Sequence, residues 1–173
     1  MTETIKALII HQMTAALDTL GYCIESCPDA EWQEAHGDAP FSQVVFHALF
    51  YADFYLGRDS VPFREQPFHV KNRSVFADYE EMEDRLPVHV YEKPFCLEYL
   101  SHCRIKLDAT VRAETEASLA GDSGIDFRKT SRAELHVYNM RHIQHHAAQL
   151  GLRLQLATGR EMPWFSGAKA VPR

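Results

Sequence analysis

The segment Arg141–Leu150 reads RHIQHHAAQL and contains three of the ten histidines of the chain. Each residue of a helix turns about 100° around the axis, so His142 and His146 lie on one face, one turn apart. His145 points away from them, toward solvent. The apolar stripe on the buried side of this helix consists of Ile143, Ala147, Leu150 and Leu154. Two neutral imidazoles at i and i+4 can bind one divalent metal ion, and pairing His142 with His145 is the weaker alternative.

This segment lies inside a long helical pattern. Ser131 and Glu134 form the capping box S-x-x-E, which begins helices. Gly159 follows Thr158, where we expect the helix to end. Three other stretches have helical periodicity, and a proline or glycines follow each of them. These stretches are Thr2 (or Thr4) to Cys27, Phe41–Leu56 and Pro94–Leu119.

The second and third helical stretches are separated by the long connection Arg58–Lys93, which is rich in prolines, aromatic residues and charges. We expect one short helix within Ser74–Arg85, and an extended segment at Ile125–Phe127. A link of this length is unusual in a compact bundle unless it crosses over the end of the bundle or covers a site. The sequence therefore predicts a single all-α domain over residues 1–173, a four-helix bundle with a long crossover between helices 2 and 3.

Composition and charge exclude some classes of function. The chain has 173 residues and a formal net charge of −6, so it lacks the basic surface that binds nucleic acid. No secretory signal is visible, nor are the roughly 18 consecutive apolar residues of a membrane span. We therefore expect a cytoplasmic protein without a membrane or nucleic-acid partner. The four cysteines lack CxxC spacing and are expected to be reduced thiols in the core. They are Cys23, Cys27, Cys96 and Cys103.

The best candidate for a third metal ligand is His47, in the middle of the apolar stretch Phe41–Leu56. Burying a polar group without a partner costs about 1–3 kcal/mol, so this side chain must be hydrogen-bonded or must bind a metal. Metal ligation would satisfy one ring nitrogen, and an acceptor beside the site would satisfy the other. A core histidine bonded to a tyrosine or to a backbone carbonyl is the alternative.

A histidine within an apolar second helix occurs here together with the pattern H-x-x-H-H-x-x-Q-L-x-x-x-L, from His142 to Leu154. This combination resembles the DinB/YfiT-like superfamily of metal-dependent enzymes, and length and helix order match over nearly the whole chain. The resemblance implies that His47, His142 and His146 bind a divalent metal ion. Members of that family often have Arg-Gly before the glutamine, whereas this chain has two alanines there.

Three protein ligands with one open position are typical of a catalytic zinc rather than a structural one. The resemblance implies a hydrolase, a thiol-dependent S-transferase or a relative of maleylpyruvate isomerase that acts on a small-molecule substrate. Zinc or nickel is the expected metal, and a low-molecular-weight thiol is the second cofactor that the resemblance suggests. Two alternatives stay open: a non-catalytic stress-related binding protein with a structural metal, and a bundle whose histidines are merely packed.

Several other polar residues are candidates for a role near the metal. Asp53, Tyr138 and Gln149 lie close to the three histidines in sequence or in helical register, and can orient the ligands or simply pack. His136 is expected to be packed or bonded within the core. Histidines of the connections are expected to be solvated, although His69 reaches the site if the long connection acts as a lid.

The apolar second helix also bears on self-association. One bundle does not cover all sides of Phe41–Leu56, so we expect a homodimer. In the C-terminal tail, Trp164 and Phe165 are expected to fold back onto the bundle, because exposed aromatic side chains are unfavourable.

Overall fold

The computed structural model describes residues 1–35, 39–58, 63–76, 79–83 and 88–167, and in these residues it contains helices, turns and loops but no β-strand. The four long helices are α1 (Thr2–Ser26), α3 (Phe41–Leu56), α5 (Lys93–Ala113) and α7 (Arg132–Thr158). The all-helical class expected from the sequence is therefore confirmed. None of the helices in this part of the chain combines the length and the apolar composition that crossing a membrane requires.

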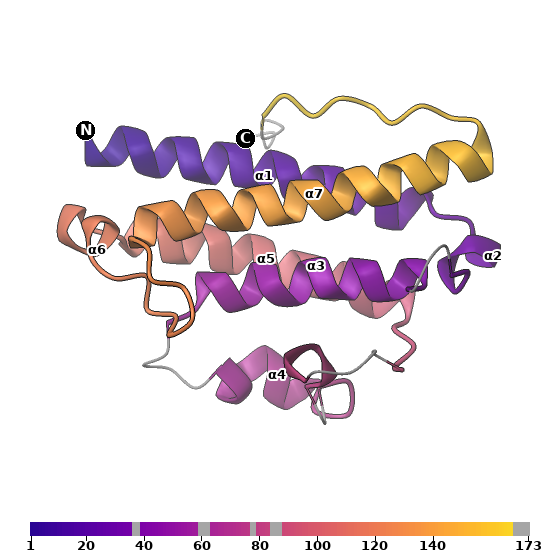
Figure 1. Cartoon of the computed structure of the whole chain (residues 1–173), viewed down its shortest axis with the longest axis horizontal. Helices are drawn as coiled ribbons and strands as arrows, with labels where there is room; N and C mark the ends of the chain where they lie inside the picture. The colour runs from indigo at the N-terminus through magenta and orange to yellow at the C-terminus, as the bar shows by residue number, and fades with distance from the viewer. Residues whose placement is uncertain (36–38, 59–62, 77–78, 84–87, 168–173) are drawn as a thin grey trace.

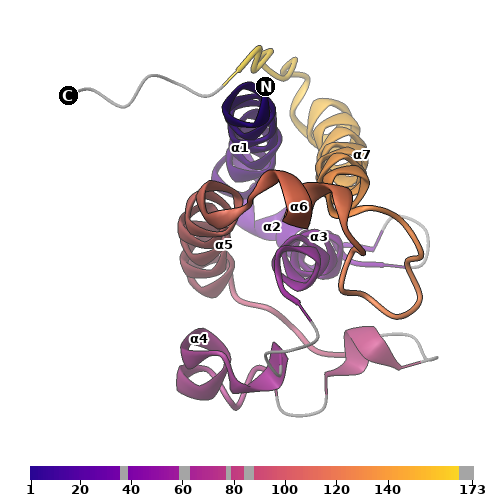
Figure 2. The ribbon, with the colours of Figure 1, turned by 90° about the vertical axis from the view of Figure 1, so that its left-hand side faces the viewer.

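The four long helices lie side by side around one core. Figure 1 shows α1 and α7 running in one direction, and α3 and α5 in the other. α1 packs against α5 and α7, and α3 packs against the same two helices. In Figure 2, α1 and α3 therefore lie on one diagonal and α5 and α7 on the other. Side chains from all four helices fill the space between them, among them Leu17, Leu20, Leu49, Phe50, Tyr99, Leu100, Ile143 and Leu150.

Local signals explain where α7 begins and ends. Ser131 Oγ accepts a hydrogen bond from the N–H of Glu134 and so satisfies one of the free donors at the N-terminus of the helix. Gly159 ends the helix with a φ of 69°, a left-handed conformation that glycine adopts at little cost. The bounds of α7 agree with the prediction, and they place His142 and His146 in the middle of a continuous helix.

The third predicted helix is divided in two. α5 ends at Ala113 because Glu114 adopts extended backbone angles, and α6 (Glu116–Ala120) begins with a cap of its own. Thr115 accepts a hydrogen bond from the N–H of Ser118, and the Ser118 hydroxyl accepts one from the N–H of Thr115. The expectation of one continuous helix over this stretch was therefore wrong, because the reciprocal cap starts a new helix.

The long connection packs on the outer side of α3 (Figures 1 and 2). Its elements are η1 (Phe63–Glu65), α4 (Pro67–Lys71) and η2 (Glu80–Met82). In the described part of Ser74–Arg85, where one short helix was expected, the structure has the short 3-10 helix η2. The described residues of the connection also contain the α-helix α4, whose first residue, Pro67, already has the φ that a helix needs. Ile125–Phe127 contains a turn rather than an extended segment.

The outer side of α3 is covered within one chain. Of its 16 residues, 13 are buried, and aromatic side chains of the connection stand against it, with Phe63 at 5.2 Å and Phe76 at 5.9 Å between ring centroids from Phe50 and Phe46 respectively. The homodimer was expected because one bundle seemed unable to cover α3. Since α3 is covered within one chain, that reason no longer applies, and the homodimer stays a prediction.

A buried carboxylate anchors the connection to the helices. Asp53 on α3 is fully buried and accepts hydrogen bonds from Tyr99 Oη at 2.9 Å, His69 Nε2 at 2.8 Å and the Lys106 ammonium. Burial alone would raise the pKa of this carboxyl group, but bonds from neighbouring histidines and the Lys106 charge hold it well below its usual range. His69, expected to be solvated, is buried instead, and its Nδ1 lies 2.9 Å from Tyr79 Oη.

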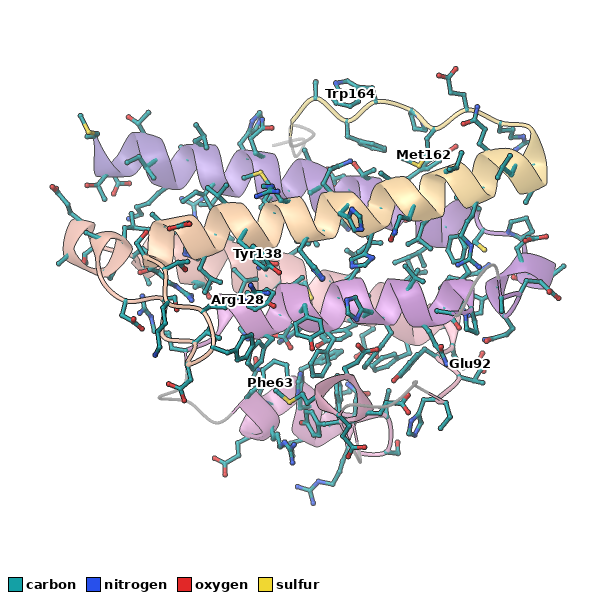
Figure 3. The ribbon with its side chains drawn as sticks, viewed as in Figure 1. Phe63, Glu92, Arg128, Tyr138, Met162 and Trp164 are labelled. Atoms are coloured by element: carbon teal, nitrogen blue, oxygen red, sulfur yellow. The ribbon has the colours of Figure 1, made fainter. Side chains whose placement is uncertain are left out.

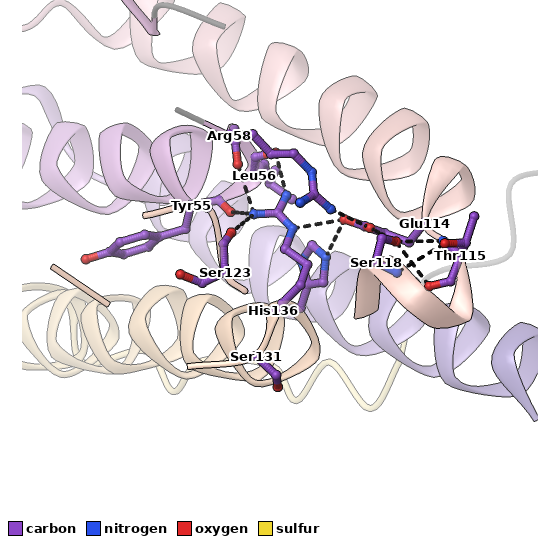
Figure 4. Close-up of polar contacts among 12 residues, drawn as sticks. Tyr55, Leu56, Arg58, Glu114, Thr115, Ser118, Ser123, Ser131 and His136 are labelled. Atoms are coloured by element: carbon purple, nitrogen blue, oxygen red, sulfur yellow. Dashed lines mark hydrogen bonds and ion pairs between the residues drawn. The ribbon is translucent and has the colours of Figure 1, made fainter. Parts of the chain in front are cut away.

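A buried arginine joins the ends of three helices (Figure 4). Arg132, the first residue of α7, donates to the backbone carbonyls of Tyr55, Leu56 and Gly57, which are the free acceptors at the C-terminus of α3. Its Nε donates to Glu114 Oε1 at 2.9 Å. His136 is also buried, with Nε2 3.4 Å from the same oxygen, so the expectation that it is packed and bonded is confirmed.

The tail after α7 is only partly packed. Figure 3 shows Met162 directed toward the helices and Trp164 directed away from them. Trp164 is 87% exposed, so its expected packing on the bundle was wrong, whereas the ring of Phe165 lies 6.1 Å from that of Tyr22 on α1. The four cysteines are free and buried, as expected.

Candidate metal centre

Three histidines from two helices meet in space. His47 lies on α3, and His142 and His146 lie one turn apart on α7, which packs against α3. Nε2 of His142 lies 3.3 Å from Nε2 of His47 and 3.2 Å from Nε2 of His146. One ring nitrogen of each histidine lies within 4.8 Å of the other two. Among the described residues, no other group of three or more His, Cys, Asp or Glu side chains brings its ligand atoms so close together. The predicted convergence of these rings is confirmed.

The outer nitrogens of two rings are held by acceptors. His47 Nδ1 lies 2.7 Å from Glu81 Oε2, and His146 Nδ1 lies 2.9 Å from Gln149 Oε1. Carboxylate and amide oxygens only accept hydrogen bonds, so we assign the ring hydrogen to Nδ1 in both histidines. The Nε2 atoms of His47 and His146 therefore present lone pairs to the space between the rings, which is the tautomer that metal ligands use.

His142 and His146, the two ligand candidates on α7, are held neutral. Burial lowers the pKa of His142 to about 3, with the neighbouring rings of His146 and His47 adding to the effect. Burial, followed by the His47 ring, lowers the pKa of His146 to about 4. At neutral pH both imidazoles therefore carry a free nitrogen lone pair, as metal binding requires.

The donor set fits a divalent metal ion. His142 Nε2 touches two other Nε2 atoms but can donate a hydrogen to one of them at most, and its buried Nδ1 has no partner in the described part of the chain. Two nitrogens that are each about 2.0–2.1 Å from a tetrahedral ion lie about 3.3–3.4 Å apart. The observed separations of 3.2 and 3.3 Å are close to that value. A shared cation would satisfy lone pairs that the protein alone leaves facing one another.

The other residues suggested from the sequence divide into two groups. Gln149 contacts a ligand histidine, as expected, and the ring of Tyr138 stacks on that of His142 at 6.4 Å. Asp53 belongs to the separate buried network between α3, α4 and α5, so of the two roles left open for it, packing in the core is the one observed. His145 is exposed, which supports His142 and His146 as the pair on α7.

Sequence reasoning missed Glu81, which lies in the 3-10 turn of the connection. It is 34 residues from His47, and no periodic pattern marks it. Its side chain is 4% exposed, and its backbone carbonyl accepts a hydrogen bond from the Tyr51 hydroxyl at 2.9 Å. The only available signal was the unusual length of the connection, which left open that it crosses over the end of the bundle or covers a site.

The rings of three tyrosines, which we call the tyrosine wall, border the histidines. Tyr51 lies 4.9 Å from His47 and 5.6 Å from His142 between ring centroids. The rings of Tyr55 and Tyr138 lie 6.2 and 6.4 Å from that of His142. Burial is the largest cause of the raised pKa values of Tyr51 and Tyr55. These hydroxyls therefore stay protonated at neutral pH, and they line the site as neutral groups.

Comparison with known protein families agrees with the geometry. The family model described as the DinB superfamily matches residues 11–150, which is most of the chain and includes all three histidines. The chain belongs to the DinB superfamily. No curated protein and no solved structure matches it significantly. The matched range includes the three converging histidines, which could hold a metal ion, and it defines no reaction.

A separate cavity lies at the C-terminal end of α3. Its volume is about 570 Å³, and none of the three histidines lines it. Phe54, Phe63 and Ile125 form apolar parts of its wall, while Glu114 and Arg132 belong to the buried ionic network described above. The metal centre is thus a half-open site beside the tyrosine wall, where the His47 side chain is 35% exposed, and not the floor of this cavity.

Proposed function

We propose that this protein is a metal-dependent enzyme that acts on a small molecule, with His47, His142 and His146 as ligands of one divalent ion. The observation that carries the proposal is the convergence of three Nε2 atoms at 3.2 and 3.3 Å, two of them on rings oriented by Glu81 and Gln149. Membership in the DinB superfamily supports it. A bound zinc or nickel ion would supply Lewis acidity and lower the pKa of a water molecule or thiol.

The residues around the histidines suit such a reaction. Glu81 fixes the tautomer of His47 and increases its basicity, because an imidazole that donates to a carboxylate is a stronger electron donor. The tyrosine wall covers one side of the rings and excludes water there. The partly exposed side chain of His47 leaves a path for a small molecule. Within this proposal the chemistry is hydrolysis or transfer to a low-molecular-weight thiol, the two classes that the family resemblance suggests.

Metal analysis tests the proposal. Wild-type protein purified without chelators and resupplied with zinc and nickel should contain about one divalent ion per chain, and His146→Ala should contain much less. His145→Ala is the matched control, because His145 is the adjacent histidine and is exposed. Equal, negligible metal content in the wild type and His146→Ala would contradict the proposal, as would equal loss of metal in both variants.

A second candidate is a non-catalytic, stress-related binding protein in which the ion is structural. It is favoured by the position of the ligands, because an ion there would join α3 to α7, and Glu81 would add the connection. Chelation separates the two candidates. Removal of a structural ion should lower the melting temperature strongly, since binding energy is then folding energy. Removal of a catalytic ion should change it little, because the core networks around Asp53 and Arg132 do not involve the ligand histidines.

We also propose the setting in which this site works. The four long helices form a single-domain four-helix bundle over residues 1–173, with a long crossover between helices 2 and 3. We place the protein in the cytoplasm, and the acidic net charge of −6 supports the proposal that it binds neither nucleic acid nor membranes. The homodimer is retained as a proposal, and light scattering at micromolar concentration that gives the mass of one chain would contradict it.

A further inference from the structure

Arg128, in the loop before α7, stands beside the proposed metal centre without a carboxylate partner in the described part of the chain. Its guanidinium carbon lies 4.2 Å from the ring centroid of Tyr138 and 5.9 Å from that of Tyr55. Its Nη2 donates to the Tyr138 hydroxyl, and its buried Nε has no partner among the described residues. Figure 3 shows the Arg128 and Tyr138 side chains next to each other. Among the described residues, the guanidinium is therefore in contact with the aromatic rings of Tyr55 and Tyr138 and not with a carboxylate.

This charge lies close to the histidines. The guanidinium and the His142 ring both lie next to the rings of Tyr55 and Tyr138. The Arg128 charge contributes, after burial and the neighbouring histidines, to the low pKa of His142, and it also acts on Tyr51 and Tyr55. Arg128 is thus part of the same site, although 14 positions in sequence separate it from the nearest of the three histidines.

The charges of the site do not balance once a metal is bound. Glu81 is the carboxylate that contacts one of the three histidines, and its hydrogen-bonding oxygen is directed at His47. A divalent ion brings two positive charges and Arg128 a third, against this one carboxylate in contact with a ligand histidine among the described residues. Because opposite charges attract strongly in a partly buried site, a positive surplus of this kind favours an anionic ligand.

We infer that Arg128 and the tyrosine wall form a subsite that binds the carboxylate of a small molecule whose other end lies at His47, His142 and His146. The inference rests on the proposed function, and it names the class of substrate: a small carboxylate with a second group able to reach the metal. Guanidinium is suited to this role because its planar set of donors pairs with both oxygens of a carboxylate. The position over the Tyr138 ring and the hydrogen bond to the Tyr138 hydroxyl restrain the side chain, and Nη1 is a nitrogen with no hydrogen-bond partner among the described residues.

Binding to the cobalt-loaded protein tests the inference without requiring turnover. Cobalt(II) takes the place of zinc, and its visible spectrum reports a carboxylate that enters its coordination sphere. The two probes are succinate and its half-amide, succinamate, because each has one carboxylate for the metal and they differ at the far end. The proteins are wild type, Arg128→Gln and the control Arg141→Gln. Arg141 is exposed, next to His142 in sequence, and its loss removes the same formal charge.

The wild type should bind succinate about tenfold more tightly than succinamate, a difference of about 1.4 kcal/mol. Arg128→Gln should bind the two within about twofold, while Arg141→Gln should keep the wild-type preference. An unchanged preference in Arg128→Gln, or none in the wild type, would overturn the inference. An unaltered cobalt spectrum before probe addition shows that the variant is folded. Failure of the wild type to bind cobalt would instead overturn the proposed function, so the two failures are distinguishable.

Discussion

Glu81 Oε2 lies 2.7 Å from His47 Nδ1, although the two residues come from different elements, η2 and α3. The contact links the long connection to the metal centre, and it predicts a loss of metal affinity when the carboxylate is removed. Residues that hydrogen-bond to metal-binding histidines typically contribute about 10–100-fold to the affinity for the metal. We expect Glu81→Ala to weaken zinc binding by that factor, measured by competition with a chromophoric chelator.

Glu65→Ala is the control for this experiment. Glu65 is an exposed carboxylate of the same connection, in η1, so its removal changes the net charge equally without touching a histidine. An affinity that falls equally in both variants would show that charge alone is responsible, and that the Glu81–His47 bond does not orient the ligand.

Arg132 should be one of the most important residues for stability. It is fully buried and bonded to Glu114 and to backbone carbonyls at the end of α3 (Figure 4). Without Arg132, the buried Glu114 keeps only the partly exposed Arg58 as a charge partner, and the carbonyls at the end of α3 lose their donors. Breaking a buried pair typically costs about 3–5 kcal/mol. We expect Arg132→Met to lower the free energy of unfolding in urea by about that amount. Arg112→Met, which removes an exposed i, i+4 pair with Asp108, should lower it by less than about 0.5 kcal/mol.

His136 should make stability depend on pH. Burial, followed by the Arg132 charge, lowers its pKa from 6.5 to about 4 in the folded protein. Between these values the unfolded chain takes up a proton that the folded chain does not, so stability falls as pH decreases from 6.5 to about 4. In the presence of chelator, the free energy of unfolding of His136→Gln should fall less steeply than that of the wild type. The difference should reach at most about 1.4 kcal/mol per pH unit.

The exposed His11 provides the comparison for that measurement. His11→Gln removes a histidine from the surface of α1 and should keep the wild-type dependence on pH between 4 and 6.5. Parallel curves for the wild type and His136→Gln would contradict a buried, neutral His136.

Periodic patterns made the helices and the two histidines of α7 predictable. Helical spacing depends only on neighbouring residues, so Ser131, Gly159 and the apolar stripe determine both the bounds of α7 and the shared face of His142 and His146. His47 was predictable because a polar side chain in an apolar helix needs a partner. These are local properties, and they carry most of the architecture.

Contacts between distant segments were not predictable in the same way. Glu81 and Arg128 lie in a 3-10 turn and a loop, where no period relates one residue to the next. The sequence left open whether Asp53 orients the metal ligands or packs, and six positions of helix after His47 turn it to the side that faces α4 and α5. Its role depends on His69 and Tyr99, whose positions the sequence of α3 alone does not contain.

Asp53 should therefore affect the metal centre indirectly, through the position of the connection. Its carboxylate accepts hydrogen bonds from His69 on α4 and Tyr99 on α5. In Asp53→Asn an amide replaces one oxygen, and the Lys106 ammonium loses its countercharge. We expect the connection to loosen, so that hydrogen exchange becomes faster in residues 63–76 and 79–83. Glu81 would then contact His47 for less of the time, and zinc affinity should fall by about threefold to tenfold although no ligand has changed.

A double variant separates this route from a general loss of stability. If Asp53 acts on the metal through Glu81, then Asp53→Asn should weaken zinc binding in the wild type but not further in Glu81→Ala, since the contact that it supports is already gone. Additive losses would mean that Asp53→Asn disturbs α3 itself and with it His47. Unchanged hydrogen exchange in the connection, together with reduced zinc affinity, would likewise contradict the proposed route.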